Sequence, residues 1–367
     1  MLVYIVIASI NPLVNLNTLN EDNHDIKVIV VDEGDESIRK VNSEILSKVK
    51  YEYYGPRERE SWFKERFGAS FERYLSLIPE RCHAETSFGF LKAFEDGADV
   101  IIELDDDVHI FSDFVKGHIE NLSNDDGVTV NSNGKWYNTI ENLSININGK
   151  IFPRGHPYES TCRLEDYIWS NVGGDCVLNM GLWNGHPDLD ALTLIHYGGL
   201  DGRGSIEGLG LKRNKIIVGK GTYFSICSMN TSFISKIIPA FYQLYMNFMG
   251  VDRFDDIWSG IFLKRISDHI GDNVCLGKPL CRHDKRVRNV FKDLLKETNG
   301  LEMNEYIWKI CENIDFSSKT YPDCYLELAY SFEKNIERWF KDGFHIKFWK
   351  FQIEKMRRWV ELIDRLD

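Results

Sequence analysis

The sequence predicts an α/β protein with an open, mostly parallel sheet flanked by helices, and the first third of the chain carries the observations for this prediction. Runs of Val and Ile at residues 3–9, 27–35 and 98–107 have the continuous apolar character of strands that are covered on both faces. The third run follows HAETSFGFLKAFEDG, whose apolar residues recur at helical spacing and whose Gly97 suits a helix end. Strands that alternate with helices favour a parallel sheet with right-handed crossovers.

The later segments predict a less regular region followed by helices. Residues 130–152 alternate in polarity around an Asn-Gly pair, which predicts a small hairpin. Residues 151–235 are rich in Gly, Pro and aromatic residues, a composition common in loops that line binding sites. The spacing of apolar residues predicts helices at 235–248 and 254–271, and two amphipathic helices that are separated near Gly343 close to the end of the chain.

Composition excludes some classes of function. The 367 residues carry a net charge of −12, which argues against nucleic acid as a partner because phosphate binding requires a basic face. The eight cysteines include no C-x-x-C pair, so reduced thiols in a cytoplasmic protein are favoured over disulfides or a zinc site. The apolar N-terminal stretch is too short to span a bilayer and is expected to form the first strand.

Three consecutive aspartates, Asp105, Asp106 and Asp107, end the third Val/Ile run. Two carboxylates about 4 Å apart repel by roughly 4 kcal/mol at an effective dielectric constant of ~20, so converging them requires a cation, a shared proton or solvent. Because alternate residues of an extended chain face the same way, Asp105 and Asp107 can offer oxygen ligands to one Mg²⁺ or Mn²⁺ ion. The alternative is a solvated acidic turn without a ligand.

A second strand end is also acidic, since Asp32, Glu33 and Asp35 close the second run. In open α/β sheets, ligands bind beyond the carboxyl ends of the strands, so the two acidic ends together predict a nucleotide site. A carboxylate at the second end can accept hydrogen bonds from uracil or from ribose hydroxyls, or it can merely stabilise a turn. Cations for a diphosphate are available in one mixed-charge helical stretch, where surface ion pairs are the alternative role: Arg57, Arg59, Lys64, Arg66 and Arg73.

Five motifs resemble the reversibly glycosylated polypeptide family, best known as plant UDP-arabinopyranose mutases. These motifs are LDDDV, GLWNGHPDLDALT, FSICSMNTSF, RFDDIWSGIFLKRISDHIG and RHDKRVRNVFKDLLKE, and the resemblance runs from about residue 3 to about residue 300. It implies a GT-A glycosyltransferase-like fold in a catalytic domain at 1–300, with a helical extension at 301–367. It also implies a UDP-sugar substrate and a divalent ion, Mn²⁺ or Mg²⁺, held by the three aspartates.

The resemblance further implies catalytic and metal-binding residues. Members become reversibly glycosylated on an arginine that follows an R-G-aromatic-P sequence, which RGHPY at 154–158 matches here. Arg163 best matches that arginine, and Arg154 is the alternative because this chain carries extra residues after it. His283 corresponds to a family histidine, and its imidazole can complete a metal site with Asp105 and Asp107; a histidine that is only hydrogen-bonded near a loop is the other reading.

The remaining candidates are expected to contact the sugar or the nucleotide. Asp255 and Asp256 begin a helix, so one is expected to cap it and the other to act on the sugar or as a base, by likeness to GT-A transferases. Trp183 can stack on a ring, although a core tryptophan is the more common role. Further substrate contacts are expected from Asp106, Asp188, Asp190 and Asn230.

The favoured function is a metal-dependent mutase that interconverts pyranose and furanose forms of UDP-arabinose or another UDP-sugar, with self-glycosylation on an arginine. One alternative is a glycosyltransferase with a separate acceptor, and another is a non-catalytic subunit that binds a nucleotide sugar. The C-terminal helix carries Trp349, Trp359 and basic residues, a pattern compatible with resting on a membrane surface. Packing on the body of the protein or on a second subunit of a homo- or hetero-oligomer is favoured instead.

Overall fold

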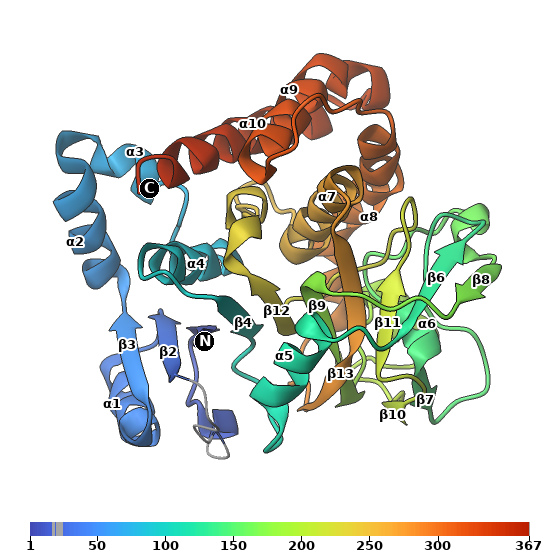
Figure 1. Cartoon of the computed structure of the whole chain (residues 1–367), viewed down its shortest axis with the longest axis horizontal. Coiled ribbons are helices and arrows are strands. Elements are labelled where there is room, and N and C mark those ends of the chain that lie inside the picture. The colour runs from blue at the N-terminus through green and yellow to red at the C-terminus, as the bar shows by residue number, and fades with distance from the viewer. Residues whose placement is uncertain (17–18, 20–24, 367) are drawn as a thin grey trace.

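The three Val- and Ile-rich runs form adjacent parallel strands in the computed structural model, which describes residues 1–16, 19 and 25–366. These strands are β1 (Leu2–Ser9), β2 (Asp25–Asp32) and β4 (Val100–Leu104). β1 lies between the other two, and β3 (Lys50–Tyr54) continues the parallel arrangement beyond β2 (Figure 1). The α/β class and the parallel arrangement of this part of the sheet are confirmed.

Beyond β4 the sheet becomes mixed. Within the described residues, thirteen strands form one sheet, and its main path runs β3-β2-β1-β4-β12-β9-β13-β11-β6-β8. β12 is antiparallel to both β4 and β9, whereas β9 and β13 are parallel to each other. The remaining strands of the sheet are β5 (Val108–His109), β6 (Val128–Ser132), β7 (Leu143–Ile145), β8 (Tyr167–Ser170), β9 (Cys176–Gly185), β10 (Gly208–Leu211), β11 (Lys215–Val218), β12 (Asn230–Ile234) and β13 (Asn273–His283).

The hairpin expected at 130–152 does not form, and this prediction was wrong. β6 pairs with β8 and β11, and β7 pairs with β10, so the two strands of this segment bond to partners elsewhere in the chain. The Asn-Gly pair does lie in a turn, where Lys135 has a φ of 68°. Pairing with strands distant in sequence therefore outweighed the local turn signal.

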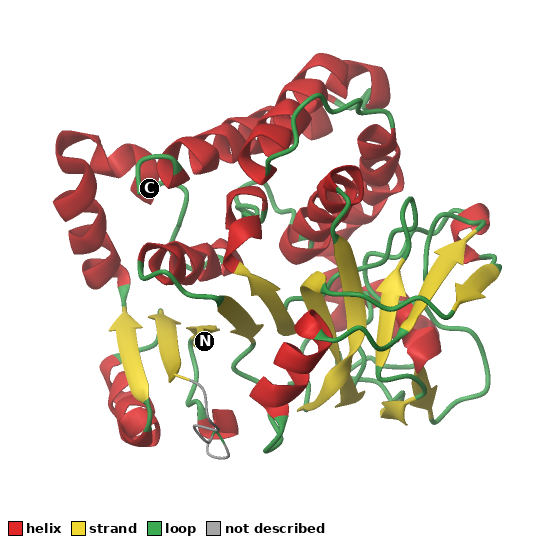
Figure 2. Ribbon diagram, viewed as in Figure 1, coloured by secondary structure: helices red, strands yellow, loops and turns green. Residues whose placement is uncertain are grey.

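Helices cover the strands and connect them. α4 (Thr86–Glu95) packs against β1 and β2, and Gly89 permits this close approach because a Cβ there would lie 2.2 Å from Val6 Cγ1. Figure 2 shows how the helices lie around the strands. The other helices up to residue 270 are α1 (Glu36–Ile45), α2 (Pro56–Phe67), α3 (Phe71–Leu75), α5 (Phe114–Ser123), α6 (Ala191–His196) and α7 (Asp255–Ile270).

The helix predicted at 235–248 is mostly absent. Only a 3₁₀ segment forms there, at Ser235–Ala240, and residues 241–246 have no regular structure. Pro239 explains the difference, because proline lacks the backbone N–H that an α-helix requires and its ring clashes with the preceding turn. Most apolar residues of this segment are nevertheless buried in the core.

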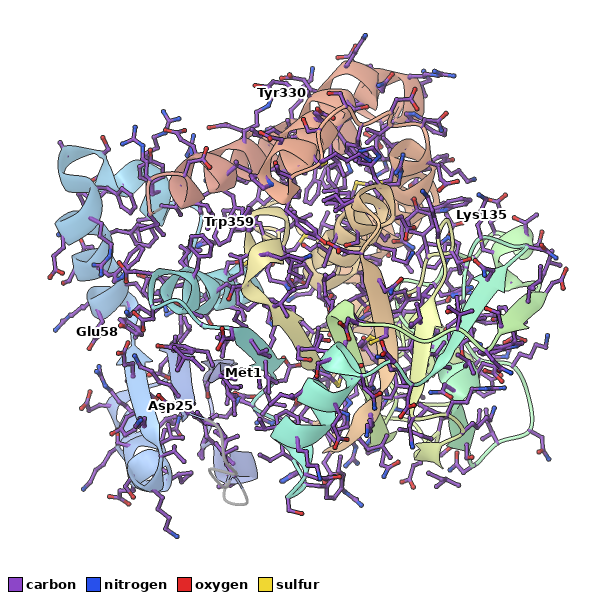
Figure 3. All side chains as sticks on the ribbon, viewed as in Figure 1. Met1, Asp25, Glu58, Lys135, Tyr330 and Trp359 are labelled. Carbon is purple, nitrogen blue, oxygen red and sulfur yellow. The ribbon has the colours of Figure 1, made fainter. Side chains whose placement is uncertain are left out.

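The C-terminal region is helical, as predicted, and it packs on the body of the protein. α8 (Val290–Glu312), α9 (Tyr321–Trp339) and α10 (Gly343–Ile363) follow the sheet, and the expected domain boundary at residue 300 lies inside α8. Trp349 and Trp359 are fully buried, and Trp359 Nε1 donates to Ile238 O where α10 meets the body (Figure 3). No helix in the part of the chain that the structure describes has the length and apolar character of a membrane-spanning segment.

Candidate active site

A cavity of about 970 Å³ opens at the carboxyl ends of β1, β2 and β4. This position follows from the parallel arrangement, which gathers the residues after each of these strands at one edge of the sheet. The lining residues that come later in the chain, from Arg154 onward, include Asp188 and Asp256 and form the other wall, called the opposite wall. The cavity thereby brings together these predicted site residues: Glu33, Asp35, Asp105, Asp106, Asp107, Arg154, Asp188, Asp255, Asp256 and His283.

The three aspartates after β4 have different neighbours. Asp106 is directed toward the end of β1, where its Oδ2 accepts hydrogen bonds from Asn11 Nδ2 at 2.8 Å and from the backbone N–H of Ile10 at 3.2 Å. Asp107 lies near His283, with 3.9 Å between its Oδ1 and His283 Nε2. Burial, and then the neighbouring carboxylates of Asp105 and Asp106, raise the pKa of Asp107 to about 6.

His283 is oriented as a neutral ligand would be. Its ring is buried, and Nδ1 lies 2.7 Å from the carbonyl oxygen of His186, which assigns the N–H to Nδ1 and leaves the Nε2 lone pair facing Asp107. Burial also lowers the pKa of His283 to about 4, so the ring is uncharged at neutral pH. A histidine that donates its other N–H to a carbonyl is common in metal sites.

These residues suit a hard divalent cation in chemistry, although they do not form a complete metal site by themselves. Carboxylate oxygens with one imidazole nitrogen are suitable ligands for Mn²⁺ or Mg²⁺. Among residues 1–16, 19 and 25–366, no group of three or more His, Cys, Asp or Glu side chains is already arranged as a metal centre. A bound ion would therefore take further oxygen ligands from a substrate or from water.

Arg154 occupies the opposite wall between two carboxylates. Its Nε and Nη2 lie 3.0 and 2.8 Å from Asp188 Oδ2, and its Nη2 lies 3.3 Å from Asp256 Oδ2. Nη1 also donates to the carbonyl oxygen of Arg253. Burial disfavours the charged guanidinium, but the two carboxylates outweigh this effect and raise the pKa of Arg154 well above its usual value.

Asp255 and Asp256 are buried neighbours with opposite pKa shifts. Burial raises the pKa of Asp256 in spite of Arg154, whereas His83 overcomes burial and lowers the pKa of Asp255. His83 Nδ1 lies 2.6 Å from Asp255 Oδ2, and its Nε2 lies 3.7 Å from Asp105 Oδ1. The imidazole therefore connects the acidic strand end to the start of α7. Neither aspartate is the N-cap of α7, since that position belongs to Phe254.

The acidic end of β2 is held by a buried arginine. Arg59, from α2, pairs with Glu33, and its Nη1 lies 3.6 Å from Glu85 Oε2. The backbone N–H of Arg81 donates to the second oxygen of Glu33 at 2.7 Å. Burial, with Glu33 close by, raises the pKa of Glu85 to about 9. Two carboxylates thus share one guanidinium on this side of the cavity.

The other two acidic residues of this turn have structural contacts. Asp32 is buried, and its Oδ1 accepts from the backbone N–H of Gly34 at 2.9 Å. Asp35 is the N-cap of α1 and accepts from the backbone N–H groups of Ser37 and Ile38. Only Asp35 of this pair lies on the cavity wall.

Four other predicted residues lie outside the residues that line the cavity. Arg163 Nε donates to Pro157 O at 2.8 Å, and its guanidinium stacks 3.9 Å from the ring centre of Tyr158. Asp190 is the N-cap of α6, and Trp183 is buried in the core. Asn230 is fully buried; its Oδ1 accepts from His118 Nε2 at 2.9 Å, and its Nδ2 donates to the carbonyl oxygens of Leu182 and Pro279.

Comparison with known proteins identifies the family. Residues 3–367 match the profile described as "Reversibly glycosylated polypeptide". The chain belongs to the reversibly glycosylated polypeptide family. The match includes α9 and α10, so it extends past residue 300, where the sequence motifs end.

Individual relatives in this family are distant. The chain is 28% identical over 281 residues to "Probable UDP-arabinopyranose mutase 1" of Solanum tuberosum, covering 73% of this chain and 68% of that protein. It is 25% identical over 347 residues to "Probable UDP-arabinopyranose mutase 4" of Arabidopsis thaliana, covering 89% and 82%. Among solved structures, S. aureus TarS 1-349 aligns over 98% of this chain and 90% of its own, at 8% identity and a TM-score of 0.33, which is too low to establish a common fold.

Three residues that line the cavity were not predicted as site residues from the sequence: His83, Arg286 and Arg288. One signal could have located His83: it precedes the helix before β4, and the N-terminus of such a crossover helix lies at the carboxyl edge of the sheet. Arg286 and Arg288 follow His283 in a segment without regular structure, and Arg286 Nη2 lies 3.5 Å from Asp106 Oδ1.

The cations expected to meet a diphosphate are mostly engaged elsewhere. Lys64 pairs with Glu60, Arg66 with Glu95 and Arg73 with Glu361, while Arg59 supports Glu33 and Arg57 lines a separate groove on α2. For most of this helical stretch, ion pairs are therefore the role that the structure provides, which was the alternative interpretation.

Proposed function

We propose that this chain is a metal-dependent UDP-sugar mutase that interconverts the pyranose and furanose forms of its substrate. The observation that carries this proposal is the cavity that joins the acidic end of β4 to the group formed by Arg154, Asp188 and Asp256. Family membership and the mutase names of the relatives support the same reaction. The order β3-β2-β1-β4, with the aspartates after β4, supports a GT-A-like fold.

The nucleotide is expected to lie along the strand ends. Glu33 and Asp35 at the end of β2 are suited to accept hydrogen bonds from uracil or ribose, and Asp105, Asp107 and His283 would hold Mn²⁺ or Mg²⁺ beside the diphosphate. When bound, such an ion neutralises the negative charge that develops on the diphosphate as its bond to the sugar breaks. Asp106 accepts hydrogen bonds from Ile10 and Asn11 at the end of β1, so we expect it to fix the position of the loop that carries the aspartates.

The sugar is expected to lie against the opposite wall. Ring interconversion requires the bond between the anomeric carbon and UDP to break, with its electron pair leaving on UDP. A hydroxyl of the same sugar then attacks the anomeric carbon and loses a proton, the former ring oxygen leaves and gains one, and UDP re-forms its bond. No proton is consumed overall. The opposite pKa shifts of Asp255 and Asp256 suit them to accept one proton and supply the other.

Arg154 is our candidate for the arginine that meets the sugar, in preference to Arg163. Arg154 lines the cavity, whereas Arg163 stacks on Tyr158 outside the lining residues. The carboxylates around Arg154 keep its guanidinium charged, which makes it a poor nucleophile. We therefore expect Arg154 mainly to bind and orient the sugar, with a covalent adduct on it as a side product.

The direct test is incubation of purified protein with a panel of UDP-sugars and Mn²⁺, including UDP-arabinopyranose, followed by chromatography. The expected result is an equilibrium mixture of ring forms that requires no acceptor, together with a glycosylated peptide that mass analysis places at Arg154. Transfer of sugar to an added glycan without ring isomers would instead identify a glycosyltransferase. Metal-dependent UDP binding without turnover of any UDP-sugar would identify a non-catalytic subunit.

A further inference from the structure

Two arginines of the cavity lie in the segment that follows His283. This segment, residues 284–289, connects β13 to α8 without regular structure, and both Arg286 and Arg288 line the cavity. Their side chains are 47% and 39% exposed, respectively. Because they line the cavity and are only partly covered by protein, these side chains can contact a ligand that enters it.

Neither guanidinium group has a close partner. Arg286 Nη2 lies 3.5 Å from Asp106 Oδ1, and Arg288 Nε lies 3.9 Å from Asp293 Oδ2. In the part of the chain that the structure describes, neither group makes a hydrogen bond. Both arginines therefore keep N–H donors that no protein acceptor uses.

Two other arginines of the opposite wall are bound to buried carboxylates. Arg154 pairs with Asp188, and Arg253 Nε lies 2.5 Å from Glu297 Oε1. These two guanidinium groups are thus committed mainly to the protein itself. The segment after His283 differs from the rest of this wall because its arginines are positioned by the chain but not neutralised by it.

Both arginines of the segment act on the aspartate that is nearest to His283. Burial, and then the neighbouring aspartates, raise the pKa of Asp107, whereas the charges of Arg286 and Arg288 lower it. His283 Nε2, at the start of the segment, lies 3.9 Å from Asp107 Oδ1. A diphosphate bound through a cation at Asp107 would therefore lie beside these two guanidinium groups.

We propose that Arg286 and Arg288 together bind the diphosphate of the UDP-sugar. This inference rests on the proposed function, which places a diphosphate beside a divalent ion at the end of β4. A guanidinium offers paired N–H donors that match the oxygens of a phosphate group. Negative charge grows on the diphosphate as its bond to the sugar breaks, so the two groups stabilise UDP as the leaving group.

The test is a double variant, Arg286→Gln with Arg288→Gln. Its affinity for UDP in the presence of Mn²⁺, measured by calorimetry, should fall about 100-fold, because each lost charge-assisted hydrogen bond lowers affinity about 10-fold. Affinity for uridine, which has no phosphate, should be unchanged. Arg286→Lys with Arg288→Lys should recover part of the UDP affinity, since an ammonium supplies the charge without the paired donors.

Two further measurements separate ligand binding from a role in supporting the acidic strand end. Affinity for Mn²⁺ alone should be unchanged or higher in the glutamine double variant, because the arginines repel a cation that approaches the aspartates. The melting temperature should change little, because both side chains are partly exposed and lose no hydrogen bond.

Arg282→Gln is the matched control. Arg282 lies at the end of β13, its side chain is 60% exposed, and its Nε lies 3.0 Å from both carboxylate oxygens of Asp284. Arg282 does not line the cavity. The same loss of positive charge at this position should leave UDP affinity within about twofold of the wild type.

Two results would overturn the inference alone: wild-type affinity for UDP in the glutamine double variant, or equal losses of affinity for UDP and for uridine. A wild-type protein that does not bind UDP would overturn the proposed function and the inference together. If UDP affinity depends on the two arginines but the wild type forms no ring isomers, the mutase reaction is contradicted and the diphosphate site stands.

Discussion

The two walls of the cavity are built in different ways. The wall at the ends of β1, β2 and β4 uses residues that directly follow buried strands, such as Glu33 and Asp106, and the hydrogen bonds that hold Asp106 to the end of β1 are made within the first 107 residues. The opposite wall joins Arg154, Asp188 and Asp256 from three separate segments. The first wall is therefore a consequence of strand order, whereas the second exists only after the whole chain has folded.

This difference separates the expected roles of the two walls. The strand-end wall gathers carboxyl groups, and burial together with neighbouring carboxylates raises the pKa values of Asp107 and Glu85. The opposite wall holds a guanidinium that two carboxylates already neutralise. We expect the first wall to bind ligand through an added cation and the second to act through a fixed, preorganised arginine.

The largest expected effect comes from the strand-end wall. Asp105→Ala combined with Asp107→Ala should lower the turnover of UDP-sugar by about 1,000-fold, since a divalent ion contributes several kcal/mol of charge stabilisation. The Mn²⁺ dependence of UDP affinity, followed by calorimetry, should disappear in the same variant. Asp190→Asn is a suitable control, because this aspartate caps α6 away from the cavity. Undiminished Mn²⁺-dependent binding by the double variant would remove the basis for a metal site here.

The second prediction addresses the opposite wall. Arg154→Met leaves Asp188 and Asp256 buried without their cation, so the free energy of unfolding should fall by about 3–5 kcal/mol. Arg154→Lys should recover part of this stability but not turnover, because an ammonium cannot reproduce the fork that contacts both carboxylates. Chemical denaturation and the chromatographic assay measure the two effects separately. Full turnover in Arg154→Lys would show that the guanidinium has no special role.

The third prediction concerns pH. Glu85 has its pKa raised in the folded protein from 4.5 to about 9. Between these values the unfolded chain binds fewer protons than the folded protein, so stability should decrease as pH rises, by up to ~1.4 kcal/mol per pH unit. Glu85→Gln removes this titration and should flatten the profile of melting temperature between pH 5 and 9. A profile as steep as that of the wild type would assign the dependence to another group.

The difference between the two walls of the cavity also explains which parts of the fold and the site could be predicted from the sequence. The Val/Ile runs identified β1, β2 and β4, and the residues that follow these strands placed Glu33 and Asp105–Asp107 at one edge because parallel strands align their carboxyl ends. The hairpin at 130–152 and the helix at 235–248 were wrong where strand pairing at long range and Pro239 overrode local patterns. Asn230 was predicted to contact the substrate because of its polar side chain. Its amide instead donates to the carbonyl oxygens of Leu182 and Pro279 and so connects β12 to β9 and β13.

The smallest expected effect distinguishes the two candidate arginines. Arg163→Met removes one hydrogen bond to Pro157 O and the stacking on Tyr158, both at a partly exposed site, so the loss of stability should be about 1 kcal/mol. Turnover should stay within about twofold of the wild type, because Arg163 does not line the cavity. Mass analysis of this variant should still find the glycosylated peptide at Arg154. If instead turnover and glycosylation were both abolished by Arg163→Met, the segment that carries Arg163 would have to move into the cavity when substrate binds, and the opposite wall would be incomplete in the free protein.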